Sequence, residues 1–505
     1  MQTVSQLLTP HYLFLRRCDI ISSSEQIGGY MAIRYGDRNQ SALFPPCVED
    51  YVPKDAAVRA YDAMVEALDF NELGIGISPD NVGNPQYDPK AMLKLHVYGT
   101  AYGVRSSRKL EREAHYNISF IWLMKQLKPD HKTIAEFRRK NKKALRNVLR
   151  QCARMCIKLG LIEGNTLFAD GSKIRANASI KNKWTKERCE DVLKKADERI
   201  EEILKECEET DLIEEDQPSH IKMQKELSDQ TALKSKVRDI LKELKDEQKK
   251  QHNTTDPECA VMNSQKGTYS GYNAQIVVDE KHGLIVSSDA VNDNNDLKQF
   301  AGQIEQANEI LGSPCKTACA DSGYATTDEL ARIDEKEIKV VVPSQRQASE
   351  KAPGRLNKER FQFDEKNNCY ICPEGHTLKF RRSDDKSRFH EYKISDPKLC
   401  LKCRQFGQCT KNKQGRSIQR LWNEAMRCKL EEEYLKPVSQ AIYKLRQQKV
   451  ELPFGHIKRN LKFDSFLLRG RDGVKAEISL AATCFNMARM ITILGVARLI
   501  QKLQG

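Results

Sequence analysis

The sequence predicts an α/β protein in which a mixed sheet follows an all-helical segment. Apolar residues recur every three or four positions over residues 57–161, which is the period of an amphipathic helix. Beyond them, short apolar runs alternate with helical segments, and two of these runs end at an acidic residue. A chain of 505 residues with 39% hydrophobic residues can build several modules, each with its own core.

The N-terminal part predicts an extension followed by a basic helical domain. Residues 1–30 differ from the rest, Met31 could itself be a translation start, and residues 31–163 form the helical domain. Residues 91–160 carry 17 Lys and Arg against 4 Asp and Glu, which nearly accounts for the formal net charge of +14. Such a surplus is typical of nucleic-acid binding, and a soluble helical domain with a solvated basic face fits the charge equally well.

One helix of this domain has a recognisable start. Pro129 predicts a turn, Thr133 is the expected N-cap with Glu136 three residues later, and Arg138 and Arg139 follow on the helix. Arg138 and Arg139 are therefore candidate DNA contacts. The alternative is a packed helix whose basic side chains face only water.

The segment after the helical domain predicts the strands of the sheet. The expected strands are 164–170, 272–279, 284–288, 317–320 and 338–342, with a helix over 296–311. Asp170 ends the first strand, and Asp321 directly follows the fourth. The order strand, hairpin, helix, strand, helix, strand, with acids after the first and fourth strands, is that of the ribonuclease H fold.

Two insertions interrupt this predicted core. Residues 184–255 are rich in Glu and Lys, with 17 basic and 20 acidic residues over 181–250, so they predict a helical hairpin that breaks at 216–219 and serves as a spacer or dimerisation arm. Residues 349–419 contain a cysteine cluster. The catalytic core is therefore expected to comprise residues 164–183, 256–348 and 420–500.

The acids suggest a catalytic site for phosphoryl transfer. Asp170 and Asp321 would lie side by side because the first and fourth strands of this fold are neighbours. Cleavage of a phosphodiester by two metal ions needs about three carboxylates, and oxygen ligands suit Mg²⁺ or Mn²⁺. Glu451 is the candidate third carboxylate, since it is the only acid between Tyr434 and Phe463. The alternative is a solvated Glu paired with neighbouring Lys side chains.

Several motifs, each weak alone, are specific in their order and combination. They span residues 169–178, 271–275, 292–296, 320–324, 450–458 and 466–470. With them the chain resembles bacterial insertion-sequence transposases of the DDE type over nearly all of residues 31–500. The resemblance implies an RNase H-like catalytic domain, a metal-binding triad of Asp170, Asp321 and Glu451, and cleavage and strand transfer at the ends of the element.

The resemblance also implies contacts with DNA. Tyr443, Arg446, Glu451 and Lys458 are similar to a Tyr-Arg-Glu-Lys signature whose members contact DNA ends near the metals. Six residues separate Glu451 from Lys458, as in that pattern, whereas four separate Arg446 from Glu451 where the usual gap is three. Residues 87–141 are similar to the DNA-binding domain of these enzymes.

The cysteine-rich segment predicts a structural zinc site of the zinc-ribbon type. Its two CxxC pairs are separated by 27 residues and consist of Cys369, Cys372, Cys400 and Cys403. His376 and Cys409 are spare candidates. The alternative is a surface insertion whose reduced cysteines bind nothing.

The implied partners are double-stranded DNA with terminal inverted repeats and a target DNA, and synapsis of two ends implies a homodimer. No secretory signal is expected, and the apolar stretch 478–500 is interrupted by Asn486, Arg489 and Arg498, so it predicts a buried helix instead of a membrane span. The expected location is the bacterial cytoplasm, at the nucleoid. Two alternative functions stay open, namely an inactive DNA-binding protein derived from a transposase and a nuclease of the same fold that cuts without joining.

Overall fold

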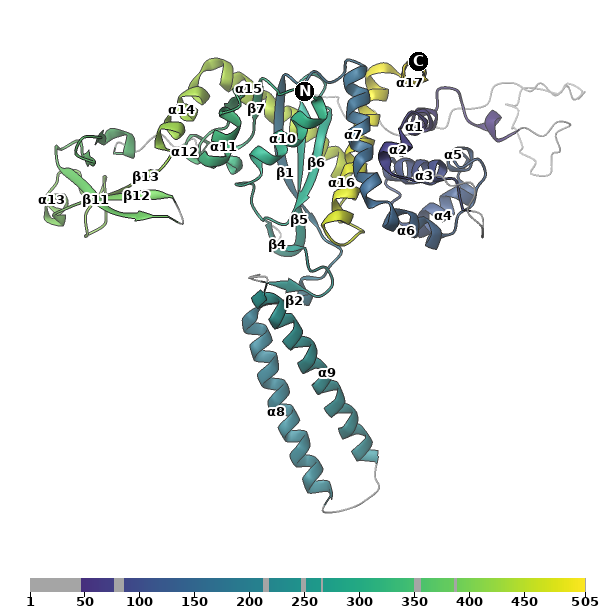
Figure 1. Cartoon of the computed structure of the whole chain (residues 1–505), viewed down its shortest axis with the longest axis horizontal. Helices are drawn as coiled ribbons and strands as arrows, with labels where there is room; N and C mark the ends of the chain where they lie inside the picture. Colours follow the sequence, from purple (N-terminus) through teal and green to yellow (C-terminus); the bar gives the residue numbers. More distant parts are fainter. Residues whose placement is uncertain are drawn as a thin grey trace, which may run out of the picture. The chain divides into compact units, whose positions relative to one another are not determined.

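The computed structural model describes residues 47–76, 86–211, 218–246, 251–264, 267–348, 356–385 and 388–504 (Figure 1). Val48–Gly505 form one structural unit. The predicted extension 1–30 and Met31 lie outside the described residues, so their interpretation stays a prediction. The fold is mixed α/β, as the sequence predicts.

Six of the described strands form a mixed sheet. They are β1 (Thr166–Arg175), β4 (Ala260–Ser264), β5 (Gly267–Asp279), β6 (Ile285–Val291), β7 (Thr317–Cys319) and β8 (Lys339–Val341). The order is β4-β5-β1-β7-β8, and β6 also pairs with β5. β1 is antiparallel to β5 and parallel to β7, and β7 is parallel to β8. All five predicted strands are therefore present, and β5 begins earlier than expected. The prediction that Asp170 ends the first strand is wrong, because the pairing of β1 with β5 continues to Arg175 and places Asp170 within β1.

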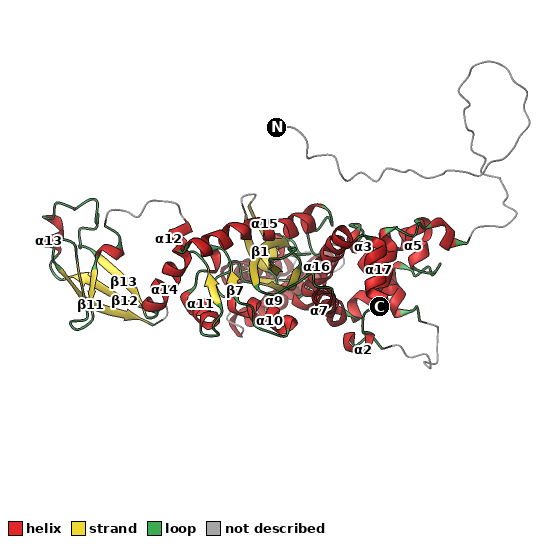
Figure 2. Cartoon of the chain, turned by 90° about the horizontal axis from the view of Figure 1, so that it is seen from above, coloured by secondary structure: helices red, strands yellow, loops and turns green. Residues whose placement is uncertain are grey.

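Helices cover both faces of the sheet. α10 (Phe300–Leu311) packs on β1, β5 and β6, and α15 (Pro437–Arg459) packs on β1, β5, β7 and β8. Figure 2 shows α10 and α15 on opposite sides of β1. The first half of β1 is apolar and buried because it lies between these two layers, whereas its polar second half extends to the edge of the core.

The N-terminal segment forms a helical layer beside the sheet. Its helices are α1 (Ala57–Glu66), α2 (Phe70–Leu73), α3 (Pro89–Ala101), α4 (Ser107–Tyr116), α5 (Ile118–Leu123), α6 (His131–Lys140) and α7 (Lys142–Lys158). One continuous hydrophobic core runs from Val52 to Leu499 through both the helices and the sheet. The boundary expected near residue 163 therefore does not interrupt the core.

The start of α6 differs from the prediction. The helix begins at His131, and its N-cap is Asp130, whose Oδ1 accepts a hydrogen bond from the Thr133 backbone N–H at 2.7 Å. The predicted N-cap Thr133 is thus wrong. Thr133 is instead the third residue of the helix, and its own backbone N–H, which has no partner within the helix, is satisfied by the Asp130 side chain.

The C-terminal helices complete the core. The predicted helix 478–500 is two helices, α16 (Arg471–Leu494) and α17 (Val496–Gln504), separated by Gly495 at φ +76°. α16 is long and apolar enough to cross a membrane by length and composition, and 67% of its most apolar window is buried inside the protein. It packs against α3, α7 and β6, as a core helix does.

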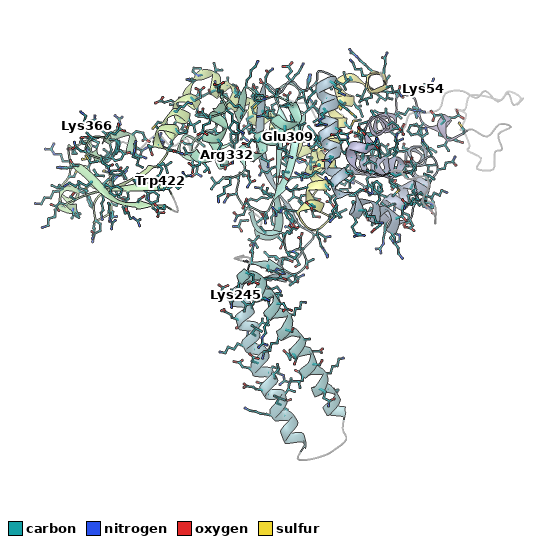
Figure 3. All side chains as sticks on the ribbon, viewed as in Figure 1. Lys54, Lys245, Glu309, Arg332, Lys366 and Trp422 are labelled. Atoms are coloured by element: carbon teal, nitrogen blue, oxygen red, sulfur yellow. The ribbon has the colours of Figure 1, made fainter. Side chains whose placement is uncertain are left out.

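The first insertion is the expected helical hairpin. α8 (Lys186–Asp211) and α9 (Pro218–Asp246) lie side by side in Figure 1, and most of the expected break at 216–219 lies at or outside the edge of the described residues. Cys189, Val237, Ile240 and Leu244 form a small core between the two helices. Charged side chains cover the rest, and Figure 3 marks Lys245 at the end of α9.

The second insertion has a sheet and an apolar core of its own. Its strands are β9 (Gln362–Asp364), β10 (Cys369–Ile371), β11 (Thr377–Asp384), β12 (Phe389–Ile394) and β13 (Ser417–Leu421). They pair antiparallel in the order β13-β12-β11-β10-β9. The chain then returns to the main sheet through α14 (Glu424–Leu435) and α15, which are separated at Lys436.

Candidate active site

Asp170 and Asp321 are brought together by the register of two parallel strands. The last residue pair of β1 and β7 joins Phe168 to Cys319, and each aspartate comes two residues after its member of this pair. Equal offsets from one pair place the two carboxylates at the same level of the sheet. Burial raises the pKa of Asp170 most, and the charge of Asp321 raises it further. The predicted pairing of these two acids is therefore present in the structure.

Asp321 is also fixed by its own backbone. It is the N-cap of the short helix η3 (Ser322–Tyr324), and its Oδ1 accepts a hydrogen bond from the Gly323 N–H at 2.8 Å. The buried Tyr324 donates its hydroxyl hydrogen bond to Gln275 Oε1 on β5. This network holds the turn after β7 against the central strands.

A third carboxylate, Asp296, lies beside this pair, although the sequence analysis gave it no role. Its Oδ1 accepts hydrogen bonds from Asn273 Nδ2 at 2.7 Å and from Gln275 Nε2 at 2.6 Å. A Cβ atom added to Gly171 would lie 2.6 Å from this Oδ1, so the carboxylate approaches β1 directly after Asp170. The missing side chain of Gly171 makes this approach possible. The paired amides of Asn273 and Gln275, two residues apart on one strand, were the available signal.

The charge balance of the site is unfavourable for an ionised Asp170. Burial is the main cause that raises its pKa, to about 7; the charges of Asp321 and Asp296 raise it further, and Arg446 opposes them. Arg446 Nη1 lies 3.5 Å from Asp170 Oδ1, and Arg446 Nε is buried without a hydrogen-bond partner. One guanidinium therefore compensates three acids only in part.

The signature residues of α15 lie along β1. The Arg446 guanidinium is 5.5 Å from the centre of the Tyr443 ring, which is half-buried. Twelve residues further on, Lys458 Nζ donates a hydrogen bond to Ser172 Oγ at 2.5 Å. Burial lowers the pKa of Lys458 while the charge of Asp170 raises it. Arg446 and Lys458 therefore place two cations on either side of the carboxylates.

Glu451 is on the same helix, but its side chain does not contact Asp170 or Asp321 and is exposed to solvent. Its Oε1 accepts a hydrogen bond from Gln447 Nε2 at 3.0 Å. Lys458 is seven positions further along the helix, so the two lie within about 20° of each other around an ideal helix. The backbone thus presents Glu451 on the side of α15 from which Lys458 reaches β1.

The three aspartates fit a divalent cation chemically. Their oxygens are the donors that Mg²⁺ and Mn²⁺ prefer, and a cation would relieve the repulsion that raises the pKa of Asp170. The Asp170 side chain keeps 19% of its surface exposed, so an ion can reach it from solvent. Within the described ranges, no three acidic, His or Cys side chains already form a cluster for a metal ion.

The two arginines predicted to contact DNA differ in orientation. Arg138 Nη1 donates a hydrogen bond to the Arg105 carbonyl at 2.9 Å, and its guanidinium faces the buried Glu477. Arg139 is exposed and pairs with Glu136 at 2.6 Å. The inward position of Arg138 argues for a role in packing, because Glu477 needs compensating charge. Arg139 is accessible to a ligand.

The predicted zinc ligands are not brought together as a set. Cys372, Cys400 and Cys403 line one cavity of the second insertion, whereas Cys369 is buried in β10 and does not line it. The fourth cysteine of the cavity is Cys409, which the sequence offered only as a spare candidate. The prediction that Cys369 lies with Cys372, Cys400 and Cys403 is therefore corrected.

Two families match the chain. Residues 46–140 match "Transposase domain (DUF772)", and residues 371–491 match "Transposase DDE domain", a range that includes Glu451 and Lys458. No curated protein matches. The chain is also similar to the cryo-EM structure of a piggyBac transposase synaptic complex with hairpin DNA, at 8% identity and a TM-score of 0.32, over 88% of this chain and 79% of that chain. A likeness this distant supports no argument.

The raised pKa of Asp170 makes stability depend on pH in the metal-free protein. Between about pH 4 and 7 the folded state holds a proton that the unfolded state has lost, so stability falls as pH rises through this range. Asp170→Asn removes this titration. We expect the free energy of unfolding in EDTA to fall less steeply for the variant, by at most about 1.4 kcal/mol per pH unit. Equal slopes for both proteins would contradict the assigned environment of Asp170.

Proposed function

The chain is an insertion-sequence DDE transposase, and we propose that it uses Asp170, Asp321 and a third carboxylate to cut the ends of its element and join them to target DNA. The observation that carries this proposal is the parallel register of β1 and β7, which sets two partly buried acids at one level. Burial, and to a lesser degree the charge of Asp321, raises the pKa of Asp170, so this pairing does not serve stability.

We assign the central sheet to the RNase H-like fold. The order β6-β5-β1-β7-β8 supports this, with the first three strands antiparallel and the last three parallel. The helix α10 between β6 and β7 and the helix α11 (Thr327–Asp334) between β7 and β8 complete the pattern. In this fold, acids on the first strand and directly after the fourth share one site, and Asp170 and Asp321 hold these two positions here.

We propose that Asp170, Asp321 and either Asp296 or Glu451 hold Mg²⁺ or Mn²⁺. When bound, these ions activate the attacking oxygen and stabilise the departing one. Asp170 has to lose its proton to act as a ligand, and Asp321 is held in position by its hydrogen bond from Gly323. Asn273 and Gln275 orient Asp296 in the same way.

The cations of α15 have a different task. Arg446 and Lys458 flank the carboxylates, and their donors suit the phosphate oxygens of DNA. Ser172 keeps the Lys458 ammonium beside β1, so we treat Ser172 as a positioning residue. Tyr443 supports Arg446 through its ring. A DNA end bound by these groups would have its phosphodiester next to the acids.

The chemistry consists of two displacements at phosphorus. In the first, a water oxygen bonds to phosphorus, the bond from phosphorus to the 3′ oxygen of the element end breaks, and that oxygen leaves as a hydroxyl. In the second, this hydroxyl attacks a phosphodiester of the target and releases a 3′ hydroxyl there. Neither step needs a covalent bond to the protein, and both need the same alignment.

We propose that the helical layer binds the element ends. α4 and α6 pack against each other. Their exposed basic side chains are Arg108, Lys109, Arg112, Lys132, Arg139 and Lys140. Such a set supports contact with the DNA backbone. We further propose that the enzyme acts in the cytoplasm at the nucleoid, as a homodimer that holds two ends with inverted repeats.

The test is cleavage and joining of DNA that carries the terminal repeats flanking the gene, in Mg²⁺ or Mn²⁺. We expect Asp170→Asn and Asp321→Asn each to lower cleavage at least about 100-fold, because each would remove a ligand of the metal ions that stabilise charge on the reacting phosphate. Binding to the end DNA, measured by gel shift, should remain. Cleavage without joining by the wild type would indicate a nuclease, and binding without either would indicate an inactive DNA-binding protein.

The same assay identifies the third carboxylate. Glu451→Gln should abolish cleavage if the family signature holds, which requires the Glu451 side chain to turn away from Gln447. We expect Asp296→Asn to reduce cleavage at least about 10-fold, since its carboxylate already lies beside Asp170. Asp293→Asn, in the same loop but exposed and bonded to Gln299, is the matched control. Wild-type cleavage by Asp296→Asn would remove Asp296 from the site.

A further inference from the structure

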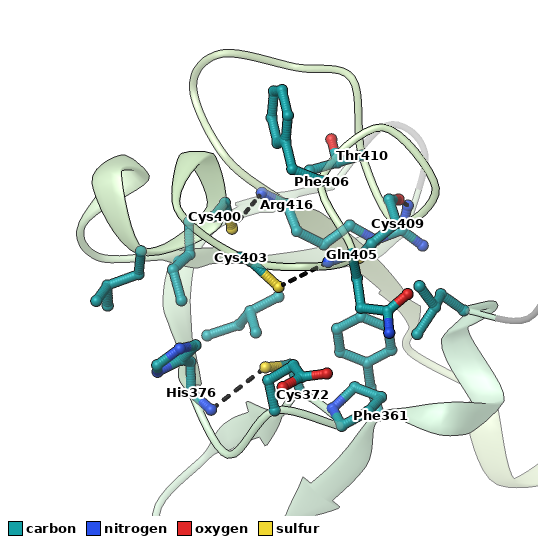
Figure 4. A pocket seen from close by; sticks show the side chains of 16 residues that line it. Phe361, Cys372, His376, Cys400, Cys403, Gln405, Phe406, Cys409, Thr410 and Arg416 are labelled. Carbon is teal, nitrogen blue, oxygen red and sulfur yellow. Dashed lines mark hydrogen bonds between the residues drawn. The ribbon is translucent and has the colours of Figure 1, made fainter.

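A cavity in the second insertion gathers four cysteines from separate parts of the chain. Cys372 follows β10, Cys400 belongs to α13 (Pro397–Leu401), Cys403 lies just after that helix, and Cys409 lies in the loop before β13. Figure 4 shows their side chains around one space. The volume of this cavity is ≈ 30 Å³, more than the roughly 10–15 Å³ that one water molecule needs. The space therefore admits a small occupant such as a water molecule or an ion.

Backbone N–H groups point at three of the four sulfur atoms. Cys372 Sγ accepts a hydrogen bond from the His376 N–H at 3.2 Å, and Cys403 Sγ accepts one from the Gln405 N–H at 3.4 Å. Cys400 Sγ accepts one from the Arg416 N–H at 3.5 Å. Hydrogen bonds to sulfur stabilise the ligating thiolate and fix its orientation, and they are a usual second layer around a metal.

Two tight turns hold these sulfurs in place. After Cys372, the Gly375 N–H donates to the Cys372 carbonyl at 2.8 Å, and Gly375 has φ +83°, which a glycine adopts without strain. After Cys400, the Cys403 N–H donates to the Cys400 carbonyl at 3.1 Å. The first turn is followed directly by the N–H donor to Cys372 Sγ, and the second brings Cys400 and Cys403 close together.

Positive charge is available beside the cavity. Arg416 lines it, and Arg416 Nη1 donates a hydrogen bond to the Cys409 carbonyl at 2.8 Å. Arg416 Nε is buried and has no hydrogen-bond partner among the residues that the structure describes. A buried donor without a partner is costly, and negative sulfur ligands nearby would compensate it. Four thiolates around Zn²⁺ carry a net charge of about −2, which this guanidinium offsets in part.

Cys369 is separated from this group by the pleat of its strand. Successive side chains of a strand point to opposite faces, so Cys369 and Tyr370 face opposite ways. Tyr370 belongs to the small apolar core against which Cys372, Cys400 and Cys409 pack, and Cys369 does not. The CxxC spacing predicted a pair, but only its second member reaches the cavity.

We propose that Cys372, Cys400, Cys403 and Cys409 bind one Zn²⁺ that holds the second insertion together. This core contains six buried apolar residues, which is little for a segment of this size, so a metal would supply much of its stability. Among the described residues the four sulfurs do not yet form a closed ligand set, so the ion would draw them together. The proposal is independent of the catalytic chemistry.

The test is the zinc content of the full-length protein, purified without chelators and measured by mass spectrometry. We expect about one zinc per chain for the wild type and for Cys369→Ser, and less than about one fifth of this for Cys409→Ser, which loses a ligand. Cys428→Ser, which alters an exposed cysteine, is a second control. Zinc retained by Cys409→Ser and lost by Cys369→Ser would overturn the proposed ligand set, as would zinc-free wild type.

A variant that misfolds would lose zinc for an indirect reason, so a second measurement uses the wild type. After exchange of zinc for Co²⁺, four sulfur ligands give tetrahedral Co²⁺ with strong sulfur-to-metal charge-transfer absorption. We expect this spectrum in the wild type and, unchanged, in Cys369→Ser. A spectrum without sulfur-to-metal absorption, or one that changes in Cys369→Ser, would overturn the proposal.

Discussion

The site depends on the position of β1 between an antiparallel and a parallel neighbour. Its pairing with β7 sets Asp170 level with Asp321, and its pairing with β5 sets Gly171 opposite Gln275. A shift of β1 by one residue would turn Asp170 to the other face and separate it from both partners. The apolar half of β1, buried between α10 and α15, fixes this register. Packing of the core therefore determines the geometry of the acids.

Electrostatics then explains why this arrangement is functional. Three carboxylates at the edge of a buried sheet repel one another, and Arg446 compensates them only in part. Asp321 and Asp296 are held in position by backbone N–H and side-chain amide donors. A site with an excess of negative charge that solvent can reach is suited to divalent cations. In the proposed mechanism, the cations on α15 complement this site by binding phosphate.

Much of this could be predicted from the sequence, because strands that end in Asp-Gly and Asp-Ser are local signals. The sheet order and the pairing of Asp170 with Asp321 followed from them. Asp296 was missed because its partners lie on β5, more than twenty residues away, and the motifs 271–275 and 292–296 do not by themselves show that their side chains meet. Cysteine spacing pointed to Cys369, but the alternation along β10 decides which sulfur reaches the cavity. Basic charge pointed to Arg138, yet burial turned it toward Glu477. In each case a contact distant in sequence decided the outcome.

The central claim is that Asp170 and Asp321 share a divalent ion. It is tested most directly by Mn²⁺ binding to the full-length protein, followed by electron paramagnetic resonance near neutral pH. We predict that the wild type binds Mn²⁺ and that Asp170→Asn and Asp321→Asn each weaken Mn²⁺ binding at least about 10-fold. Mutation of a residue that only hydrogen-bonds to a metal ligand already lowers metal affinity by about this factor, and loss of the ligand itself should lower it at least as much. Unchanged Mn²⁺ affinity in both variants would contradict the account.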